Sequence, residues 1–200
     1  HQGVAYERFV GEGAMALLPK TLSESNLLAQ DNGFGLVWTL SDENIEEIST
    51  ADESIFLQQL QKNFGYRAGR FLQSGQRKSY PLTMSIAKEQ VRPNLVILGN
   101  AAHAIHPVAG QGYNLSIRDV MALADNIQTS LATGNPIGKL TQLVTYLHKQ
   151  EADQKRTIAF CDGLMKLFSR QESSIMLARK LGLLGLDVSI SFKSRFAKAA

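Results

Sequence analysis

One segment, Leu95–Asp119, combines residue types and spacing that suit ligand binding; it reads LVILGNAAHAIHPVAGQGYNLSIRD. The apolar run Leu95–Leu98 predicts a strand buried on both faces, as in a parallel sheet. Gly99 ends the run, where a ligand can approach the backbone closely and where open α/β sheets bind ligands. Gly110–Gly112 then opens a long helical pattern, whose first N–H groups lack partners within the helix and carry partial positive charge. The segment therefore predicts a site for phosphate, carboxylate or a ring that develops negative charge.

Polar and stiff residues in the same segment support this interpretation. Asn100 offers a short polar side chain, Pro107 stiffens the loop, and Asn114 lies in the first turn of the predicted helix. The segment is not the dinucleotide fingerprint GxGxxG, because Leu115 occupies its third glycine position. A plain structural turn stays open as the alternative to ligand binding.

The sequence offers weaker signals for metal binding and for catalysis. His103 and His106 could ligate a metal, but no nearby Cys, third His or carboxylate cluster completes a set of ligands. Arg118 and Asp119 could act in catalysis, although adjacent opposite charges early in a helix are more typical of a solvated or capping pair. The chain has no Gly-x-Ser-x-Gly elbow, which argues against a hydrolase of that type.

The residues before this segment predict antiparallel sheet with one helix. Asn32-Gly33 is a strong hairpin signal, because these residues tolerate positive φ. Trp38 is expected to pack in the core, and Pro81 marks an edge or irregular strand. A helix is expected over 52–63, ended by Gly65. The predicted strands span 4–10, 14–18, 26–29, 35–40, 67–74 and 80–87.

The remaining residues predict helices. One helix is expected over 111–133, ended by Gly134-Asn135-Pro136, and helical spacing continues from about residue 138. Cys161 lies on an apolar stripe there, which predicts an inert core thiol. The last pattern, 175–199, mixes leucines with Lys and Arg. This stretch could face a membrane, a partner or the protein's own core.

Composition and charge exclude several classes of protein. The chain has 200 residues, of which 44% are hydrophobic and 20% charged, as in soluble globular proteins. Its net charge of +3 comes from scattered basic residues rather than a stripe, so no nucleic-acid partner is expected. The single cysteine rules out an intrachain disulfide and fits a reducing compartment. No apolar stretch is long enough to span a bilayer and no signal peptide is evident, so a cytoplasmic location is expected.

The ordered motif in this segment resembles a known family. Gly99-Asn100-Ala101-Ala102-His103, His106-Pro107 and Gly110-Gln111-Gly112-x-Asn114 resemble the second FAD-binding motif of class A flavoprotein aromatic hydroxylases. The runs 5–9, 16–19 and 36–38 are similar to the ubiquinone-biosynthesis branch of that family, and the resemblance weakens after about residue 170. The family's usual Gly-Asp is here Gly99-Asn100, and Asn can both accept and donate a hydrogen bond but carries no charge.

The resemblance implies an enzyme, an FAD-dependent NAD(P)H aromatic monooxygenase. NAD(P)H or another donor would reduce the flavin, and O2 would supply one oxygen atom to a lipid-soluble polyprenylated phenol. The substrate is expected between the flavin and the sheet of residues 4–40 and 67–87. The implied FAD-binding residues, with His103 orienting the loop rather than acting as a general base, are Gly99, Asn100, His103, Pro107, Gly110, Gln111, Gly112 and Asn114. No catalytic residue is assigned and no metal is expected.

The resemblance also sets the expected domain organisation. The family's GxGxxG and middle Asp-Gly motifs are absent from this sequence, so the chain is expected to be a carboxyl-terminal fragment that by itself is inactive and lacks FAD. The expected fold class is α/β, with α+β character in this fragment. It comprises a substrate-binding antiparallel sheet (1–90), the last strand-loop-helix of a Rossmann-like FAD-binding domain (91–134) and a carboxyl-terminal helical region (135–200).

Two rival functions stay open. One is a sibling hydroxylase that acts at another position of the same ring, and the other is a flavin-free scaffold in a quinone-biosynthesis complex. Partners in such a complex and peripheral contact with the inner membrane face are further expectations of the resemblance.

Overall fold

The computed structural model describes residues 3–11, 13–20, 33–107, 110–170, 172–189 and 193–194. It is a mixed α/β chain with two compact units, which are described separately below. The first unit comprises His1–Tyr80 and Leu167–Arg179, and the second comprises Pro81–Lys166 and Lys180–Ala200. The expected functional boundaries at residues 90 and 134 stay a prediction.

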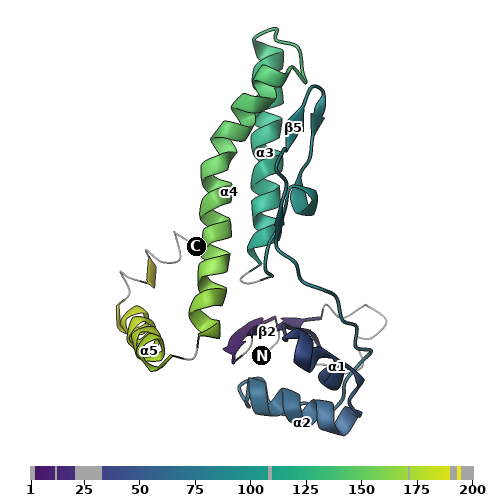
Figure 1. Cartoon of the computed structure of the whole chain (residues 1–200), viewed down its shortest axis with the longest axis vertical. Coiled ribbons are helices and arrows are strands. Elements are labelled where there is room, and N and C mark those ends of the chain that lie inside the picture. The colour runs from purple at the N-terminus through teal and green to yellow at the C-terminus, as the bar shows by residue number, and fades with distance from the viewer. Residues whose placement is uncertain are drawn as a thin grey trace. The chain divides into compact units, whose positions relative to one another are not determined.

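An antiparallel sheet forms the first part of the first unit (Figure 1). Its strands are β1 (Tyr6–Val10), β2 (Gly13–Pro19) and β3 (Phe34–Trp38), with β2 in the middle. The register pairs Tyr6 with Leu17 and Met15 with Trp38. These strands confirm the strand predictions over 4–10, 14–18 and 35–40. The predicted strand 26–29 and most of the predicted hairpin turn lie outside the described residues.

Two helices provide the other half of this unit's core. They are α1 (Asp42–Thr50), which the sequence patterns did not predict, and α2 (Glu53–Phe64), which they did. Alternation along β2 brings Met15 and Leu17 to one face of the sheet, where they pack with apolar side chains of α2. Trp38 packs at the edge of this cluster as expected. Its buried members are Met15, Leu17, Phe56, Leu60 and Phe64.

The predicted strands over 67–74 and 80–87 are largely wrong. Only Ser85–Ile86 (β4) forms a ladder. In the first stretch, the Phe71 N–H donates to the side chain of Gln61 at 3.0 Å and the Ser74 N–H donates to Glu53 at 2.6 Å. Side chains of α2 thus accept backbone hydrogen bonds that the carbonyls of a neighbouring strand would accept in a sheet.

The second unit begins with a short hairpin, and here the prediction of a buried parallel strand over Leu95–Leu98 is wrong. Val91–Arg92 (β5) pairs antiparallel with Leu95–Val96 (β6), and the turn between them holds Asn94 at φ 59°. Leu95 is 50% exposed. Antiparallel strands, such as β6 and its neighbour β5, can have one face in solvent, whereas the strands of a parallel sheet are covered on both faces.

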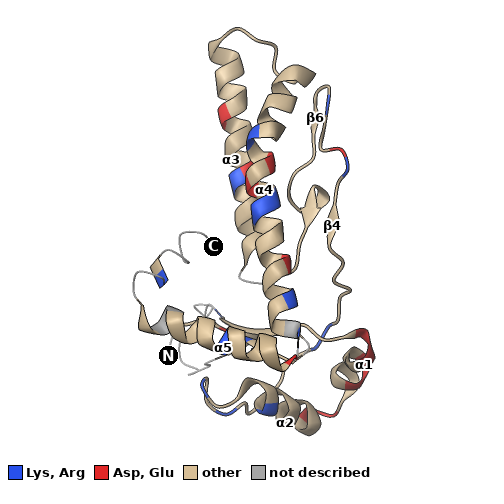
Figure 2. Cartoon of the chain, turned by 60° about the vertical axis from the view of Figure 1, so that its left-hand side comes forward, with Lys and Arg blue, Asp and Glu red and all other residues tan. Residues whose placement is uncertain are grey.

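Two long antiparallel helices dominate the second unit, where they lie side by side (Figures 1 and 2). They are α3 (Gln111–Ala132) and α4 (Leu140–Ser169), close to the predicted ranges. Val91, Leu143 and Tyr146 form a buried cluster with the hairpin. Cys161 is buried on α4, as the apolar stripe predicted. A further helix, α5, spans Ser173–Val188.

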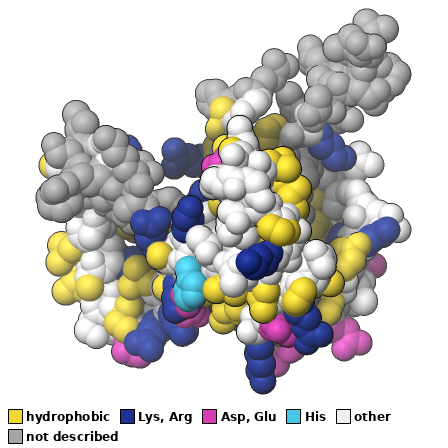
Figure 3. All heavy atoms as spheres, turned by 90° about the horizontal axis from the view of Figure 1, so that it is seen from above, with side chains coloured by type: hydrophobic (Ala, Val, Ile, Leu, Met, Phe, Trp, Pro, Cys, Tyr) yellow, Lys and Arg dark blue, Asp and Glu magenta, His cyan; other side chains and the backbone are white. Residues whose placement is uncertain are grey.

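Charges of both signs are mixed over the described surface. In Figure 2, the ribbon of α3 and α4 carries both acidic and basic residues, and Figure 3 shows hydrophobic side chains between charged ones on one face. This agrees with the scattered basic residues of the sequence. Within the described ranges, no helix has the length and apolar character needed to cross a membrane.

Candidate functional site

Residues 99–107 and 110–112, which carry most of the predicted ligand-binding motif, lead into α3 and are here called the glycine loop. It starts with a single helical turn, η2 (Gly99–Ala101), and continues as β7 (His103–Ala104), which pairs antiparallel with β4. The Ala102 N–H donates to the carbonyl of Gly99 at 2.9 Å, and the Ala87 N–H donates to the carbonyl of Ala102 at 2.8 Å. The first half of the loop is therefore tied to a neighbouring strand.

The second half of the loop forms the amino terminus of α3. Gly110 caps the helix in the left-handed region, with φ 63°, a conformation that favours glycine. Apart from Gly110 and its two chain neighbours, no described residue has an atom within 4 Å of the position that a Cβ of residue 110 would occupy. The first N–H groups of α3 therefore begin beside open space, which is the geometry expected of an anion or polar ring site.

The predicted site residues divide into three groups by exposure. Asn100, Pro107, Gly110 and Asn114 are exposed. Gly99, Gln111 and Gly112 are half-buried. His103 differs from all of them, because only 1% of its surface is exposed. Seven of the eight residues can therefore meet a ligand at the loop surface, whereas His103 can act only from beneath it.

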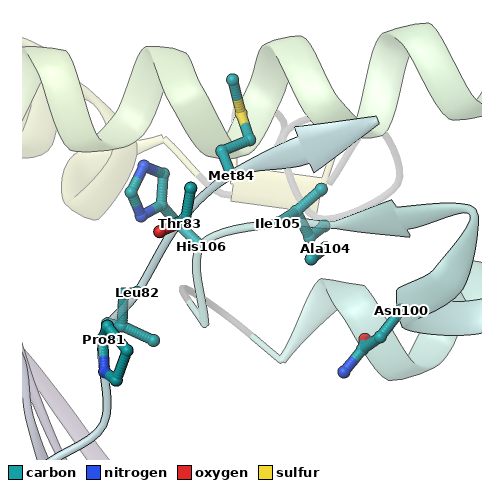
Figure 4. Close-up of a pocket in the computed structure, with 8 residues that line it drawn as sticks. All are labelled: Pro81, Leu82, Thr83, Met84, Asn100, Ala104, Ile105 and His106. Atoms are coloured by element: carbon teal, nitrogen blue, oxygen red, sulfur yellow. The ribbon is translucent and has the colours of Figure 1, made fainter. Parts of the chain in front are cut away.

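A small recess lies beside the glycine loop (Figure 4). Its volume is about 200 Å³, and its walls come from the extended segment 81–84, from residues 104–106 and from Asn100 in η2. The lining mixes apolar side chains with the polar groups of Thr83, Asn100 and His106. Drug-sized ligands usually occupy about 300–1,000 Å³, so this recess suits one ring or part of a larger molecule.

His103 and His106 do not act together. The Nε2 atom of His103 lies 2.6 Å from Oδ2 of Asp119, whereas His106 lines the recess. Over the described residues, His, Cys, Asp and Glu side chains form no group of three or more that could hold a metal.

The expectation that Arg118 and Asp119 form a solvated or capping pair is wrong. Arg118 instead donates from Nε to Asp153 at 2.6 Å and from a terminal nitrogen to Thr157 at 2.9 Å, both on α4. Burial alone would raise the pKa of Asp153, but hydrogen bonds from Arg118 and Arg156 outweigh it and lower this pKa. Asp119 points the other way and its side chain is fully buried against His103. No local pattern reveals this contact, because the two residues lie 16 positions apart.

The buried Tyr146 on α4 should make the free energy of unfolding depend on pH. Its hydroxyl is buried and has no hydrogen-bond partner within the described part of the chain. Burial, and then the charge of Asp119, raise the pKa of Tyr146 above the ordinary value of about 10. The folded state therefore keeps a proton that the unfolded chain loses, so the free energy of unfolding falls as pH rises beyond about 10.

The variant Tyr146→Phe tests this. We expect its free energy of unfolding to equal or exceed that of the wild type near pH 7, since the hydroxyl is unpaired. The variant should also lose less stability than the wild type between about pH 9 and pH 11 in urea titrations. Identical losses in the two proteins over this range would contradict the assignment.

Comparison with protein families defines the class of this chain. The model of the FAD binding domain family matches residues 13–159, which include strands β2 and β3 of the antiparallel sheet, the glycine loop, all of α3 and most of α4. The chain belongs to this FAD-binding family.

Individual relatives share sequence over most or all of the chain. It is 32% identical to the ubiquinone hydroxylase UbiL of Rhodospirillum rubrum, over all of the chain and 44% of the relative. It is 29% identical to the mitochondrial ubiquinone biosynthesis monooxygenase COQ6 of Homo sapiens, over 90% of the chain and 44% of the relative. It is 30% identical to the 3-demethoxyubiquinol 3-hydroxylase of Escherichia coli, over 98% of the chain and 47% of the relative. The chain thus spans less than half the length of these curated relatives.

Proposed function

We propose that this chain is part of an FAD-dependent monooxygenase that hydroxylates a polyprenylated phenol ring in ubiquinone biosynthesis. The observation that carries the proposal is the glycine loop, whose exposed residues surround the open amino terminus of α3 in a chain of the FAD-binding family. The names of the relatives, which include a ubiquinone hydroxylase and a 3-demethoxyubiquinol 3-hydroxylase, support the same ring as substrate.

The residues present fit a flavin. Gly110 leaves open space next to the first N–H groups of α3, which have no partner within the helix, and a flavin ring needs hydrogen-bond donors where negative charge develops. We assign Pro107 and Gly110–Gly112 to the ring region of the flavin, Asn114 to the ring side, and Asn100 to the ribityl or diphosphate side. When bound and reduced, FAD supplies activation of O2 and transfer of one oxygen atom to an electron-rich ring.

The chain's own contribution is binding, orientation and electrostatics. The helix-start N–H groups would stabilise negative charge at the N1–C2=O edge of the flavin. Asn100, neutral where the family usually has Asp, would bind without adding negative charge near the diphosphate. Gly99, Gln111 and Gly112 complete the backbone surface that the flavin meets. No residue of the chain is assigned a proton-transfer role.

The recess beside the loop is a candidate position for part of the ring substrate. Asn100 lines the recess and belongs to the proposed flavin surface, so a ring bound there would lie next to the cofactor. Its volume of about 200 Å³ leaves no room for a polyprenyl tail, which would extend outside. The substrate class we propose is that of 2-octaprenyl-6-methoxyphenol hydroxylase.

Further parts of the proposal concern the whole protein. We infer the last strand-loop-helix of a Rossmann-like FAD-binding domain from the order of β6, η2 and α3 along the chain; the antiparallel pairing of β6 with β5 is not part of that pattern. NAD(P)H is the proposed reductant. Partners from a quinone-biosynthesis complex and contact with the inner face of the membrane, where the lipid substrate dissolves, belong to the same proposal.

A sibling hydroxylase is the second candidate, because three relatives with different names have nearly equal identities to the chain, of 29–32%. The two are separated by the polyprenylated phenols that accumulate in a strain lacking the gene. We expect an intermediate that lacks the hydroxyl at the position attacked by 2-octaprenyl-6-methoxyphenol hydroxylase. An intermediate already hydroxylated there would favour the sibling.

The first test of the proposal is whether the full-length protein holds flavin. We expect the purified protein to show visible flavin absorbance, or to acquire it when FAD is added, and to consume NAD(P)H in the presence of its phenol. A protein that stays colourless after FAD is added would favour a scaffold and overturn the monooxygenase proposal.

A further inference from the structure

His103 is held from below by a buried carboxylate. Its Nε2 atom lies 2.6 Å from Oδ2 of Asp119, and both side chains are fully buried. A buried carboxylate is costly unless hydrogen bonds compensate its lost hydration. Asp119 lies on α3, one helical turn beyond the buried Leu115, so this face of the helix packs beneath the glycine loop.

Two amide side chains complete the arrangement. Nε2 of Gln154, on α4, donates to Oδ1 of Asp119 at 3.1 Å. Gln154 and Gln90 also exchange two amide hydrogen bonds, of 3.1 and 3.2 Å. Gln90 directly precedes β5, so one buried chain of hydrogen bonds joins the loop, both long helices and the hairpin. Here it is called the Asp119 network (Gln90, His103, Asp119 and Gln154).

The network determines which atom carries each proton. A carboxylate has no hydrogen to give, so Asp119 accepts from Gln154 through one oxygen and from His103 through the other. The side-chain amide of Gln154 must point its nitrogen at Asp119, because in the flipped orientation its oxygen would face a carboxylate oxygen. His103 therefore donates from Nε2, and its ring is fixed in one orientation in the middle of the glycine loop.

We propose that Asp119 is a positioning residue that acts through His103 to hold the glycine loop in its cofactor-binding shape. His103 lies between two exposed parts of the loop, at Asn100 and at Gly110, and its buried side chain is held by Asp119. The ladder with β4 ties the backbone of the same stretch, so the His103 side chain adds a second anchor from α3. The inference rests on the proposed function for the identity of the cofactor, but the effect on the loop can be measured without it.

The variant Asp119→Asn removes the charge and leaves the size unchanged. Its amide presents one acceptor and one donor where the carboxylate presents two acceptors, so the strong bond to His103 or the bond to Gln154 weakens. A matched control is Asp153→Asn, which also removes the charge of an aspartate, but one on α4 that pairs with Arg118 and does not belong to the Asp119 network.

Hydrogen exchange of the flavin-free, full-length protein tests the effect on the loop. We expect backbone amides of residues 99–106 and 110–114 to exchange about tenfold faster in Asp119→Asn than in the wild type, and unchanged in Asp153→Asn. Equal exchange of the loop in Asp119→Asn and the wild type would overturn the inference, whether or not the protein binds FAD.

A double-mutant cycle on FAD affinity tests the route through His103. We expect Asp119→Asn to weaken FAD binding several-fold in the wild-type background, and to have no further effect when combined with His103→Ala. A purely structural role would lower the unfolding temperature without this coupling in the dissociation constant. Additive effects of the two substitutions on FAD binding would therefore contradict the inference. A wild type that binds no FAD would contradict the proposed function, and hydrogen exchange alone would then test the role of Asp119.

Discussion

Replacing Gly110 with alanine is expected to weaken FAD binding by about tenfold, because left-handed backbone costs a non-glycine residue roughly 1–2 kcal/mol. Gly110 has φ 63° and caps α3 where the open space begins. The new methyl group would enter that space, on the path by which a ligand reaches the first N–H groups of the helix. The measurement is the FAD dissociation constant of the full-length protein, from flavin fluorescence quenching.

Gly134 offers a matched control for this substitution. Its φ is 68°, and apart from Gly134 and its two chain neighbours no described residue has an atom within 4 Å of the position of its missing Cβ. It lies just beyond the opposite end of α3, so Gly134→Ala imposes the same backbone strain far along the helix from the glycine loop. We expect both variants to lose similar stability and only Gly110→Ala to lose FAD affinity. Equal affinities in the two variants would show that the loop does not receive the cofactor.

Replacing Leu115 with alanine is expected to lower the free energy of unfolding by about 2–5 kcal/mol, through lost burial and a residual cavity. Leu115 is fully buried, with an exposed fraction of 0%, on the face of α3 that also carries Asp119. The unfolding temperature should fall by several degrees for each kcal/mol lost. Calorimetry or urea unfolding of the flavin-free protein measures the effect.

Val120 provides the comparison on the same helix. Val120 is an apolar residue of α3 like Leu115, but it is 48% exposed. Val120→Ala should therefore change the free energy of unfolding by no more than about 0.5 kcal/mol. A large loss in Val120→Ala, or a negligible one in Leu115→Ala, would mean that the face of α3 that packs inward is not the one described here.

Local patterns predicted much of the fold. The strands β1–β3 and the helices α2, α3 and α4 follow from alternation, helical spacing and glycine or proline boundaries, all of which depend on neighbours in sequence. The same patterns failed over 67–87 and at Leu95. Whether an extended segment joins a sheet depends on a partner strand, and here side chains of α2 or a short hairpin took its hydrogen bonds.

The sequence by itself indicated the class of cofactor, and it predicted the segment that we propose binds it, because the motif from Gly99 to Asn114 is continuous in the chain. Only the tertiary structure decided what lies beneath that segment. Asp119 appears in the sequence as half of an ordinary charged pair with Arg118. Packing of α3 against α4 turns the two side chains apart, so that Arg118 pairs with Asp153 while Gln154 and His103 enclose Asp119. A buried carboxylate needs partners from distant parts of the chain, and those partners meet only when the helices pack.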